Sequence, residues 1–197
     1  MCIRDRFYSI SNCQRGLTGV SFGHFLIKQV VEEVSRELPR LSTFVTLSPV
    51  PGFARWLKRE REAEQSAVLS AEDRSELARL DTAEWWQSKE ATDALREPLM
   101  RAAASYFLVA RTPSGSAVDP VARFHLGNGA RLEQINWLAD LSPKGLAQSH
   151  SLMVNYLYDL EDIETNHEAY AEGRTIVASS AVRKLARGTL HLVPVAG

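Results

Sequence analysis

The sequence has few cysteines and no excess of charge of either sign, and these absences exclude several classes of protein. Only Cys2 and Cys13 occur among the 197 residues, without a CxxC or Cys/His spacing of the kind that binds a metal. A disulfide scaffold is therefore excluded, and we expect a reducing, cytoplasmic compartment. With 23 Lys and Arg against 24 Asp and Glu, the formal net charge is -1. Because no positive excess is available to release counterions, we predict no nucleic-acid partner.

Long apolar segments are absent as well. The longest run, Ala102 to Ala110, lies between Arg101 and Arg111, and it is too short to cross a hydrocarbon layer of about 30 Å. Residues 1–6 carry charge but no apolar core of a signal peptide. We therefore predict no association with a membrane. Hydrophobic residues (45%) and charged residues (24%) occur in globular proportions, which excludes a disordered or collagen-like chain.

The first fifty residues predict a strand, a glycine-rich loop, a helix and a second strand. Phe7–Ile10 is short and apolar, and apolar residues recur at helical spacing over about 22–38, where Pro39 follows. Residues 43–47 form the second predicted strand. This order predicts a βαβ unit with parallel strands. Because the first strand has almost no lead-in, we expect the chain to be truncated at its N-terminus.

The rest of the chain predicts further helices and extended segments. We predict helices over about 70–80, 97–111 and 162–187, the last with Gly173 as a weak point, and extended segments over 120–126, 132–138 and 152–158. Ser70 and Asp73 have the spacing of a capping box at the start of a helix. The triplet Gly127-Asn128-Gly129 is typical of a hairpin turn, so the two segments beside it are expected to pair.

Three glycines mark a candidate anion site. Gly16, Gly19 and Gly23 lie between the first predicted strand and the first predicted helix. Free N–H groups and the positive dipole end at a helix start favour a bound anion such as phosphate. The pattern is neither the Walker form nor GxGxxG. A tight turn without any ligand also accounts for these glycines, and the spacing alone favours it.

Two single residues are candidates for chemistry. Ser48 is predicted at the carboxyl end of a strand just before Pro49, a position where open α/β sheets bind ligands and where serines also cap turns. His125 lies between Phe124 and Leu126, where a histidine is either catalytic or structural. His24 is close enough to the glycine loop to touch a ligand. The remaining histidines have no metal-ligand spacing, so no metal is predicted.

Several blocks of sequence together closely resemble the malonyl-CoA decarboxylase family. The resemblance runs from about Phe7 to Arg187. The blocks that carry it are Tyr8-Ser-Ile-Ser11, Gly16-Leu-Thr-Gly-Val-Ser-Phe-Gly23, Phe25-Leu-Ile-Lys28, Leu47-Ser-Pro-Val-Pro-Gly-Phe53, Phe124-His-Leu-Gly-Asn-Gly-Ala130 and Ile135-Asn-Trp-Leu-Ala-Asp140. They include the glycine loop, Ser48 and His125.

The resemblance implies a fold and a set of site residues. The fold is α/β (α+β), with a mixed sheet flanked by helices that is similar to the GCN5-related N-acetyltransferase fold. The family's catalytic pair falls on Ser48 and His125. The substrate-binding residues that it implies are a CoA loop, Thr18-Gly19-Val20-Ser21-Phe22-Gly23-His24, and two groups near the malonyl carboxylate, Ser9 and Tyr158. Some members carry a glutamate in the loop that partners the histidine, where this chain has Ser21.

The resemblance also implies a domain organisation. Residues 1–6 look foreign to the family, residues 7–187 match part of its catalytic domain, and residues 188–197 form a tail. The helical N-terminal domain that the family uses in oligomerisation is not found in this chain. We therefore expect a homo-oligomer for the full-length protein.

The reaction implied by the resemblance is decarboxylation of malonyl-CoA to acetyl-CoA and CO2. The thioester carbonyl of this substrate can accept the electrons that remain when CO2 leaves, so no cofactor is expected, and CoA is part of the substrate. Ser48 and His125 would assist proton transfer to the enolate. The alternatives are a CoA-dependent acyltransferase on the same fold and an inactive fragment that binds CoA.

Overall fold

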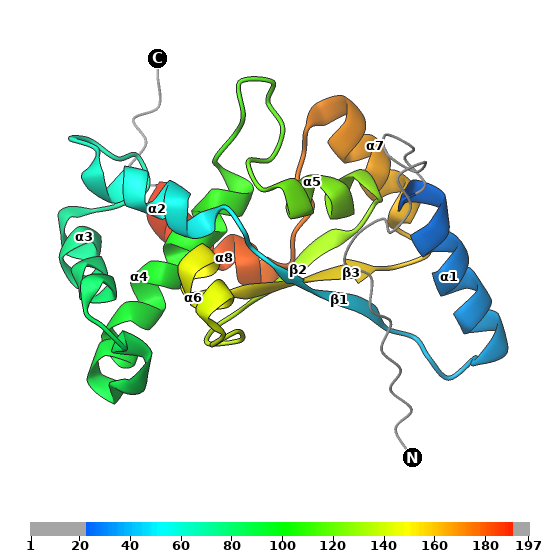
Figure 1. Cartoon of the computed structure of the whole chain (residues 1–197). Coiled ribbons are helices and arrows are strands. Elements are labelled where there is room, and N and C mark those ends of the chain that lie inside the picture. Colours follow the sequence, from blue (N-terminus) through cyan, green and yellow to red (C-terminus); the bar gives the residue numbers. More distant parts are fainter. Residues whose placement is uncertain (1–22, 191–197) are drawn as a thin grey trace, which may run out of the picture.

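A three-stranded antiparallel sheet organises the protein, shown as a computed structural model that describes residues 23–190 (Figure 1). Its strands are β1 (Phe44–Pro49), β2 (Arg131–Asn136) and β3 (Met153–Tyr158). The strand order is β1-β3-β2, and β3 pairs antiparallel with both neighbours. On β3, alternate residues are buried, so one face of the central strand belongs to the core.

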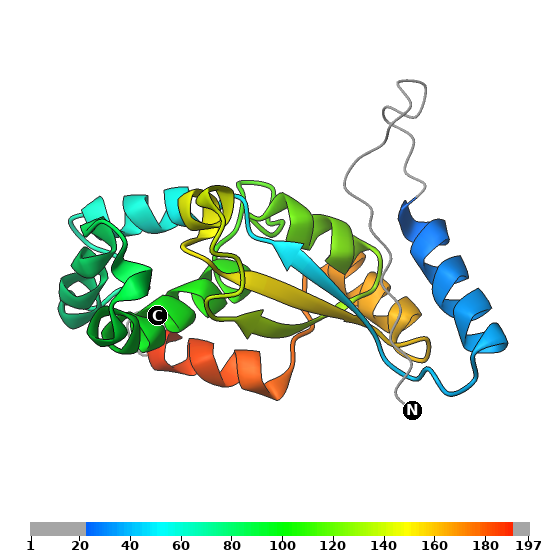
Figure 2. The ribbon, with the colours of Figure 1, turned by 60° about the horizontal axis from the view of Figure 1, so that its bottom comes forward.

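Helices surround this sheet and extend beyond both of its ends. They are α1 (Gly23–Glu37), α2 (Phe53–Glu62), α3 (Ala71–Leu77), α4 (Lys89–Leu108), α5 (Pro120–Gly127), α6 (Pro143–Ser149), α7 (Ile163–Gly173) and α8 (Ser180–Leu190), with 3-10 turns at Ala78–Asp81 and Trp85–Gln87. Figure 2 shows α5 above the sheet and α8 below it. In Figure 1, α1 lies at one end of the molecule and α2, α3 and α4 lie at the other. The sheet therefore has a helix on each face, while Val45 and Leu47 of β1 stay exposed.

Several predicted elements are confirmed. The strands expected at 43–47, 132–138 and 152–158 correspond to β1, β2 and β3, and the helix expected at 22–38 corresponds to α1. Ser70 caps α3 as its spacing with Asp73 predicts, because its Oγ accepts from the Asp73 backbone N–H while the Asp73 carboxylate accepts from the Ser70 N–H. The α/β class is thus confirmed, whereas likeness to the acetyltransferase fold stays a prediction.

The predicted parallel pairing is not seen among residues 23–190. There β1 pairs with β3 in antiparallel register, from Phe44 opposite Tyr158 to Pro49 opposite Met153. The described partner of β1 therefore comes from late in the chain. The strand expected at Phe7–Ile10 lies outside the described residues. Its parallel pairing with β1 therefore stays a prediction.

The hairpin predicted around residues 120–138 is wrong, because its first arm is a helix. Asp119 caps α5 by accepting hydrogen bonds from the backbone N–H groups of Val121 and Ala122, both at 2.9 Å. Pro120 occupies the first helical turn, where its missing N–H costs nothing. Gly129, at φ +77°, follows the end of this helix instead of forming a hairpin turn.

The long terminal helix predicted over 162–187 is two helices. Arg174 ends α7 with a left-handed backbone (φ +50°), and the chain then runs extended alongside β2. There the Leu132 N–H donates to Val177 O and the Ser179 N–H donates to Leu132 O, both at 2.9 Å. This segment satisfies part of the outer edge of β2 before α8 begins.

Gly129 offers a test of how tightly the end of α5 is packed. A Cβ built on this residue would lie 2.1 Å from the carbonyl oxygen of Ile163. A left-handed backbone alone costs an alanine about 1–2 kcal/mol. Because of the collision with Ile163, we expect Gly129→Ala to lower the free energy of unfolding by clearly more than this. Urea denaturation measures the loss.

Gly115 is the matched control for this substitution. It also has a positive φ, +79°, but its added Cβ would find only Arg174 Cγ at 3.9 Å. Gly115→Ala should therefore show the backbone cost without the collision. Equal losses in the two variants would contradict close packing of α7 against the end of α5.

Candidate active site

Three buried side chains form a continuous hydrogen-bonded chain on one face of the sheet. The Ser48 Oγ lies 3.1 Å from His125 Nε2, and His125 Nδ1 lies 2.7 Å from the Tyr158 hydroxyl. Ser48, His125 and Tyr158 are 5%, 8% and 3% exposed. The structure thus brings together three of the residues singled out in the sequence.

The elements explain how three residues so far apart in sequence meet. In the register of β1 on β3, Ser48 lies opposite Val154 while Tyr158 lies opposite Phe44, so the two hydroxyl residues occupy opposite ends of the paired strands. His125 comes from α5, which lies over this face (Figure 2), and spans the gap between them. The helix that the sequence did not predict is therefore what delivers the imidazole.

Two further residues, which the sequence did not single out, touch this chain. The Ser48 hydroxyl donates to Thr46 Oγ1 at 3.1 Å. The ring of Tyr156 stacks on the imidazole of His125, with ring centroids 4.4 Å apart and planes at 21°. Both residues follow from strand alternation, since Thr46 is two residues before Ser48 and Tyr156 two before Tyr158. That spacing was the available signal.

Burial sets the charge of this site. It lowers the pKa of His125 to about 4 and raises the pKa of Tyr158 above its usual value. Imidazole and phenol are therefore both neutral at pH 7. Among residues 23–190, the partners that hydrogen-bond to the His125 ring are hydroxyls rather than carboxylates. Ser21, which the resemblance aligns with the glutamate of some family members, lies outside the described residues.

Asp119 anchors the helix that carries His125. Its side chain is 1% exposed, caps α5, and accepts a hydrogen bond from the Tyr106 hydroxyl at 3.2 Å. Burial raises the pKa of this carboxyl even though its hydrogen bonds act in the opposite direction. The start of α5 is thus fixed to the helix α4, and the imidazole position depends on that anchor.

The predicted substrate loop is only partly described. Ser9, Thr18, Gly19, Val20, Ser21 and Phe22 lie outside the described residues. Gly23 and His24 are the first two residues of α1. The contribution of these residues to CoA binding therefore stays a prediction.

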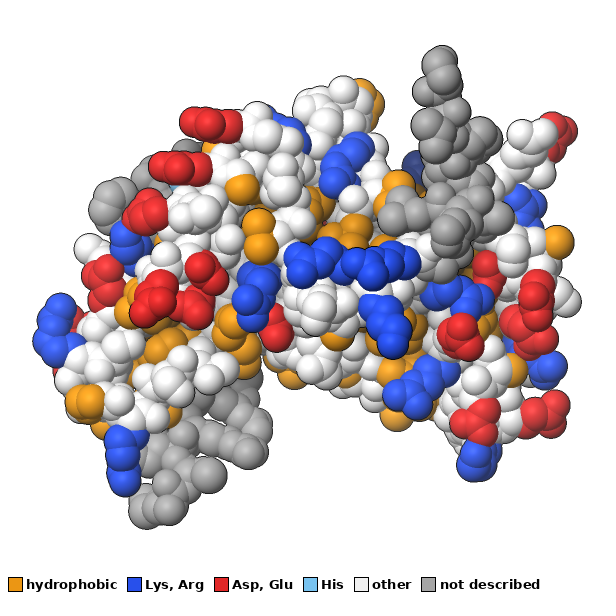
Figure 3. All heavy atoms as spheres, turned by 180° about the vertical axis from the view of Figure 1, so that it is seen from behind, with side chains coloured by type: hydrophobic (Ala, Val, Ile, Leu, Met, Phe, Trp, Pro, Cys, Tyr) orange, Lys and Arg blue, Asp and Glu red, His pale blue; other side chains and the backbone are white. Residues whose placement is uncertain are grey.

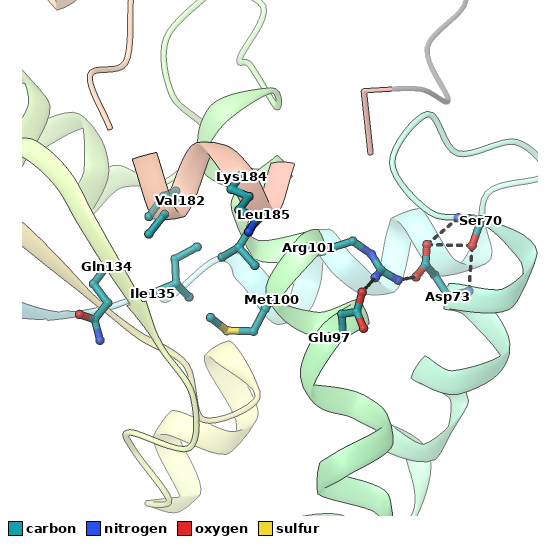
Figure 4. A pocket seen from close by; sticks show the side chains of 11 residues that line it. Ser70, Asp73, Glu97, Met100, Arg101, Gln134, Ile135, Val182, Lys184 and Leu185 are labelled. Atoms are coloured by element: carbon teal, nitrogen blue, oxygen red, sulfur yellow. Dashed lines mark hydrogen bonds and ion pairs between the residues drawn. The ribbon is translucent and has the colours of Figure 1, made fainter. Parts of the chain in front are cut away.

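A separate hollow of about 780 Å³ lies between α3, α4, α8 and β2 (Figure 4). Met100, Ile135, Val182 and Leu185 give it an apolar lining, and the ion pair of Arg101 with Asp73 closes one side. It shares no residue with the hydrogen-bonded chain of Ser48, His125 and Tyr158. The hollow is therefore distinct from the candidate active site.

Surface charge, metal-ligating side chains and helix length bear on other kinds of site in the described part of the chain. Lys and Arg side chains gather across the middle of the rear face, with acidic side chains toward its ends (Figure 3). Within residues 23–190, no three His, Cys, Asp or Glu residues are grouped so that they could hold a metal ion. No helix in the same range is both long and apolar enough to cross a bilayer.

Comparison with known proteins identifies the family of this chain. Residues 4–194 match the family described as malonyl-CoA decarboxylase C-terminal domain. Two curated relatives, each named mitochondrial malonyl-CoA decarboxylase, come from Anser anser anser and Mus musculus. Each is 41% identical, over 194 and 197 residues, which cover 89% and 91% of this chain. The chain spans 38% and 40% of the length of these relatives.

Solved structures agree with the sequence comparisons. Malonyl-CoA decarboxylase from Rhodopseudomonas palustris is 61% identical, with a TM-score of 0.86, over 91% of this chain and 41% of that one. The enzyme from Agrobacterium vitis is 59% identical, also with a TM-score of 0.86, over 91% of this chain and 44% of that one. The fold described above is therefore shared with both.

Two histidines, the buried His125 and the half-buried His150, predict a loss of stability in mild acid. Burial lowers the pKa of both His125 and His150 to about 4, whereas an unfolded histidine titrates near 6.5. Between these values the unfolded chain binds protons that the folded chain does not, so the free energy of unfolding falls as pH falls. We expect a loss on the order of 2 kcal/mol per histidine at pH 5 relative to pH 7.5, measured by urea denaturation.

A variant separates the two histidines. His150 packs edge-on against Phe53, away from the hydrogen-bonded chain. His150→Asn should therefore remove about half of the pH dependence and leave the contribution of His125. A pH dependence unchanged by this substitution would contradict the assignment.

Proposed function

Because this chain belongs to the malonyl-CoA decarboxylase family, we propose that it carries the catalytic residues that convert malonyl-CoA to acetyl-CoA and CO2. The observation that carries the proposal is the buried chain from Ser48 through His125 to Tyr158. It lies within the stretch that matches the family. Relatives and solved structures that match this stretch are named for the same reaction.

The chemistry asks two things of the protein. When CO2 leaves, the electron pair of the broken C–C bond passes into the thioester as an enolate. The site must stabilise the enolate oxygen, for which one well-placed donor contributes about 3–4 kcal/mol. It must also deliver a proton to the α-carbon, which a positioned acid accelerates roughly 10²–10⁴-fold. Since the thioester itself accepts the electrons, we propose that no cofactor takes part.

His125 becomes the acid when substrate binds. In the free protein its low pKa keeps the imidazole neutral at pH 7. A malonyl carboxylate beside it favours the imidazolium, because a nearby negative charge raises the pKa of a histidine. The proton taken up from water is the one that the reaction consumes, since a carboxylate is replaced by a hydrogen on carbon.

Proton delivery then passes through Ser48. The Ser48 O–H bond breaks as its proton forms the new C–H bond, and the Nε2 proton of His125 moves to Oγ. Histidine is then neutral, with its remaining proton on Nδ1, and no charge remains in the buried site; proton exchange after product release returns the ring to its resting tautomer. A protonated Nδ1 also turns its hydrogen bond around, so that it donates to the Tyr158 oxygen. The Tyr158 proton is then free to bind the malonyl carboxylate, together with Ser9.

The substrate's CoA part is assigned to the loop Thr18-Gly19-Val20-Ser21-Phe22-Gly23-His24. Helix α1 begins at Gly23, so its first free N–H groups and the positive end of its dipole are available to a pyrophosphate at this loop.

We propose further that the full-length protein is a homo-oligomer. We also propose that it acts in the cytoplasm, although its curated relatives are named mitochondrial.

A chimaera tests the reaction. This chain replaces the matched region of the Rhodopseudomonas palustris relative, which is 61% identical to it. We expect the chimaera to release CO2 and acetyl-CoA from malonyl-CoA. The same assay is run on the chain by itself for comparison. A folded chimaera that binds CoA without releasing CO2 would contradict the decarboxylase assignment and favour a CoA-binding role.

Substitutions in the chimaera test the two catalytic roles. Ser48→Ala and His125→Asn should each lower kcat roughly 10²–10⁴-fold, because each removes one carrier of the proton. CoA binding, measured by calorimetry, should remain in both.

His150→Asn is the matched control for these substitutions. It also replaces a histidine of low pKa, but one that is half-buried and outside the hydrogen-bonded chain. We expect it to keep the kcat of the unchanged chimaera. Near-normal turnover in Ser48→Ala and His125→Asn would contradict the roles given to these residues.

A further inference from the structure

The hydroxyl of Thr46 lies behind the Ser48–His125 pair and has no role in the reaction described above. We propose that Thr46 is a positioning residue that fixes the direction of proton transfer by holding the Ser48 proton away from His125. The reaction that it serves is the proposed decarboxylation, so this inference rests on that function. The hydrogen-bond geometry from which we argue is independent of that function.

The argument begins with the single proton on the Ser48 hydroxyl. That proton is donated to Thr46 Oγ1, 3.1 Å away. Ser48 Oγ also lies 3.1 Å from His125 Nε2. Because one hydroxyl proton cannot serve two acceptors, the hydrogen bond to the ring must be donated by the imidazole. Thr46 thereby places the imidazole proton on Nε2.

The far side of the ring agrees with this assignment. The low pKa of His125 leaves the imidazole neutral, so it has only one N–H group. With that proton on Nε2, Nδ1 is an acceptor and receives the Tyr158 hydroxyl proton at 2.7 Å. The hydrogen bonds therefore all run in one direction, from Tyr158 through His125 and Ser48 to Thr46.

Thr46 is held in place as an acceptor. Its hydroxyl oxygen also receives the backbone N–H of Tyr156 across the β1–β3 pair, at 3.4 Å. Its carbonyl oxygen accepts from the Asn155 side chain at 2.7 Å. With donors from Ser48 and Tyr156, both lone pairs of the hydroxyl are occupied. Threonine is also stiff at χ1, so the oxygen has little freedom to turn away.

The direction of these bonds matters for the proposed reaction. Ser48 can give its proton to the α-carbon and be refilled from His125 only if Nε2 carries a proton pointing at Oγ. Without the Thr46 oxygen, the nearest acceptor for the Ser48 proton is Nε2 itself. The resting ring would then carry its proton on Nδ1, and Nε2 would have to lose the hydrogen bond from Ser48 before it could be protonated and refill Ser48. Thr46 thus selects the tautomer that is ready to deliver a proton.

The test compares two substitutions in the chimaera. Thr46→Val keeps the branched shape and removes the hydroxyl, whereas Thr46→Ser keeps the hydroxyl. Nitrogen-15 NMR of labelled histidine reports which ring nitrogen of His125 is protonated. We expect the proton on Nε2 in the unchanged protein and in Thr46→Ser, and on Nδ1 in Thr46→Val. We expect kcat of Thr46→Val to fall about tenfold or more, with KM unchanged, because one oriented hydrogen bond is lost.

Each result decides the proposal. A proton on Nδ1 in the unchanged protein would overturn it, and so would a Thr46→Val variant that keeps both the Nε2 proton and normal kcat. A lower kcat in Thr46→Val without a change of tautomer would assign Thr46 a merely structural role and also overturn it. A change of tautomer supports the positioning role even if the unchanged protein releases no CO2, a result that would instead contradict the proposed function. Circular dichroism verifies that both variants are folded.

Discussion

The antiparallel register between β1 and β3 is the constraint on which the rest of the site depends. It places Thr46 and Ser48 on the same face as Tyr156 and Tyr158, so that four side chains from two strands line one surface. Helix α5 then lies over that surface and inserts His125 among them. Because side chains alternate along a strand, a shift of one residue would turn both hydroxyl residues of β1 away from the imidazole.

Burial gives this arrangement its chemical character. The site contains an imidazole, two aromatic hydroxyls and two aliphatic hydroxyls, all neutral at pH 7, and the described partners of the histidine are hydroxyls. In a water-poor site, charge appears only when the substrate brings it. Such a site differs from a serine hydrolase triad, in which a carboxylate orients the histidine at all times. Here the hydroxyls of Thr46 and Tyr158 set the orientation from the two ends.

Sequence reasoning predicted the strands well and misjudged the elements whose form depends on caps and tertiary partners. The strands containing Ser48 and Tyr158 were predicted from their apolar residues. Residues 120–126 were predicted as extended because the following Gly-Asn-Gly is typical of a hairpin. The capping carboxylate of Asp119 outweighed that signal, since its two backbone hydrogen bonds start a helix. The single helix predicted at 162–187 was divided because residues 177–179 pair with β2, a long-range contact without a local signature.

The sequence by itself determined the family, the α/β class and the identities of Ser48, His125 and Tyr158, since these depend on residue types in a fixed order. Only the tertiary structure decided that Tyr158 contacts the imidazole, that Thr46 accepts the Ser48 proton and that Tyr156 stacks on His125. The physical reason is that hydrogen-bond direction and ring stacking need atoms within a few ångströms. Such distances arise from the pairing of β1 with β3 and from the capped helix above them, which join segments far apart in the chain.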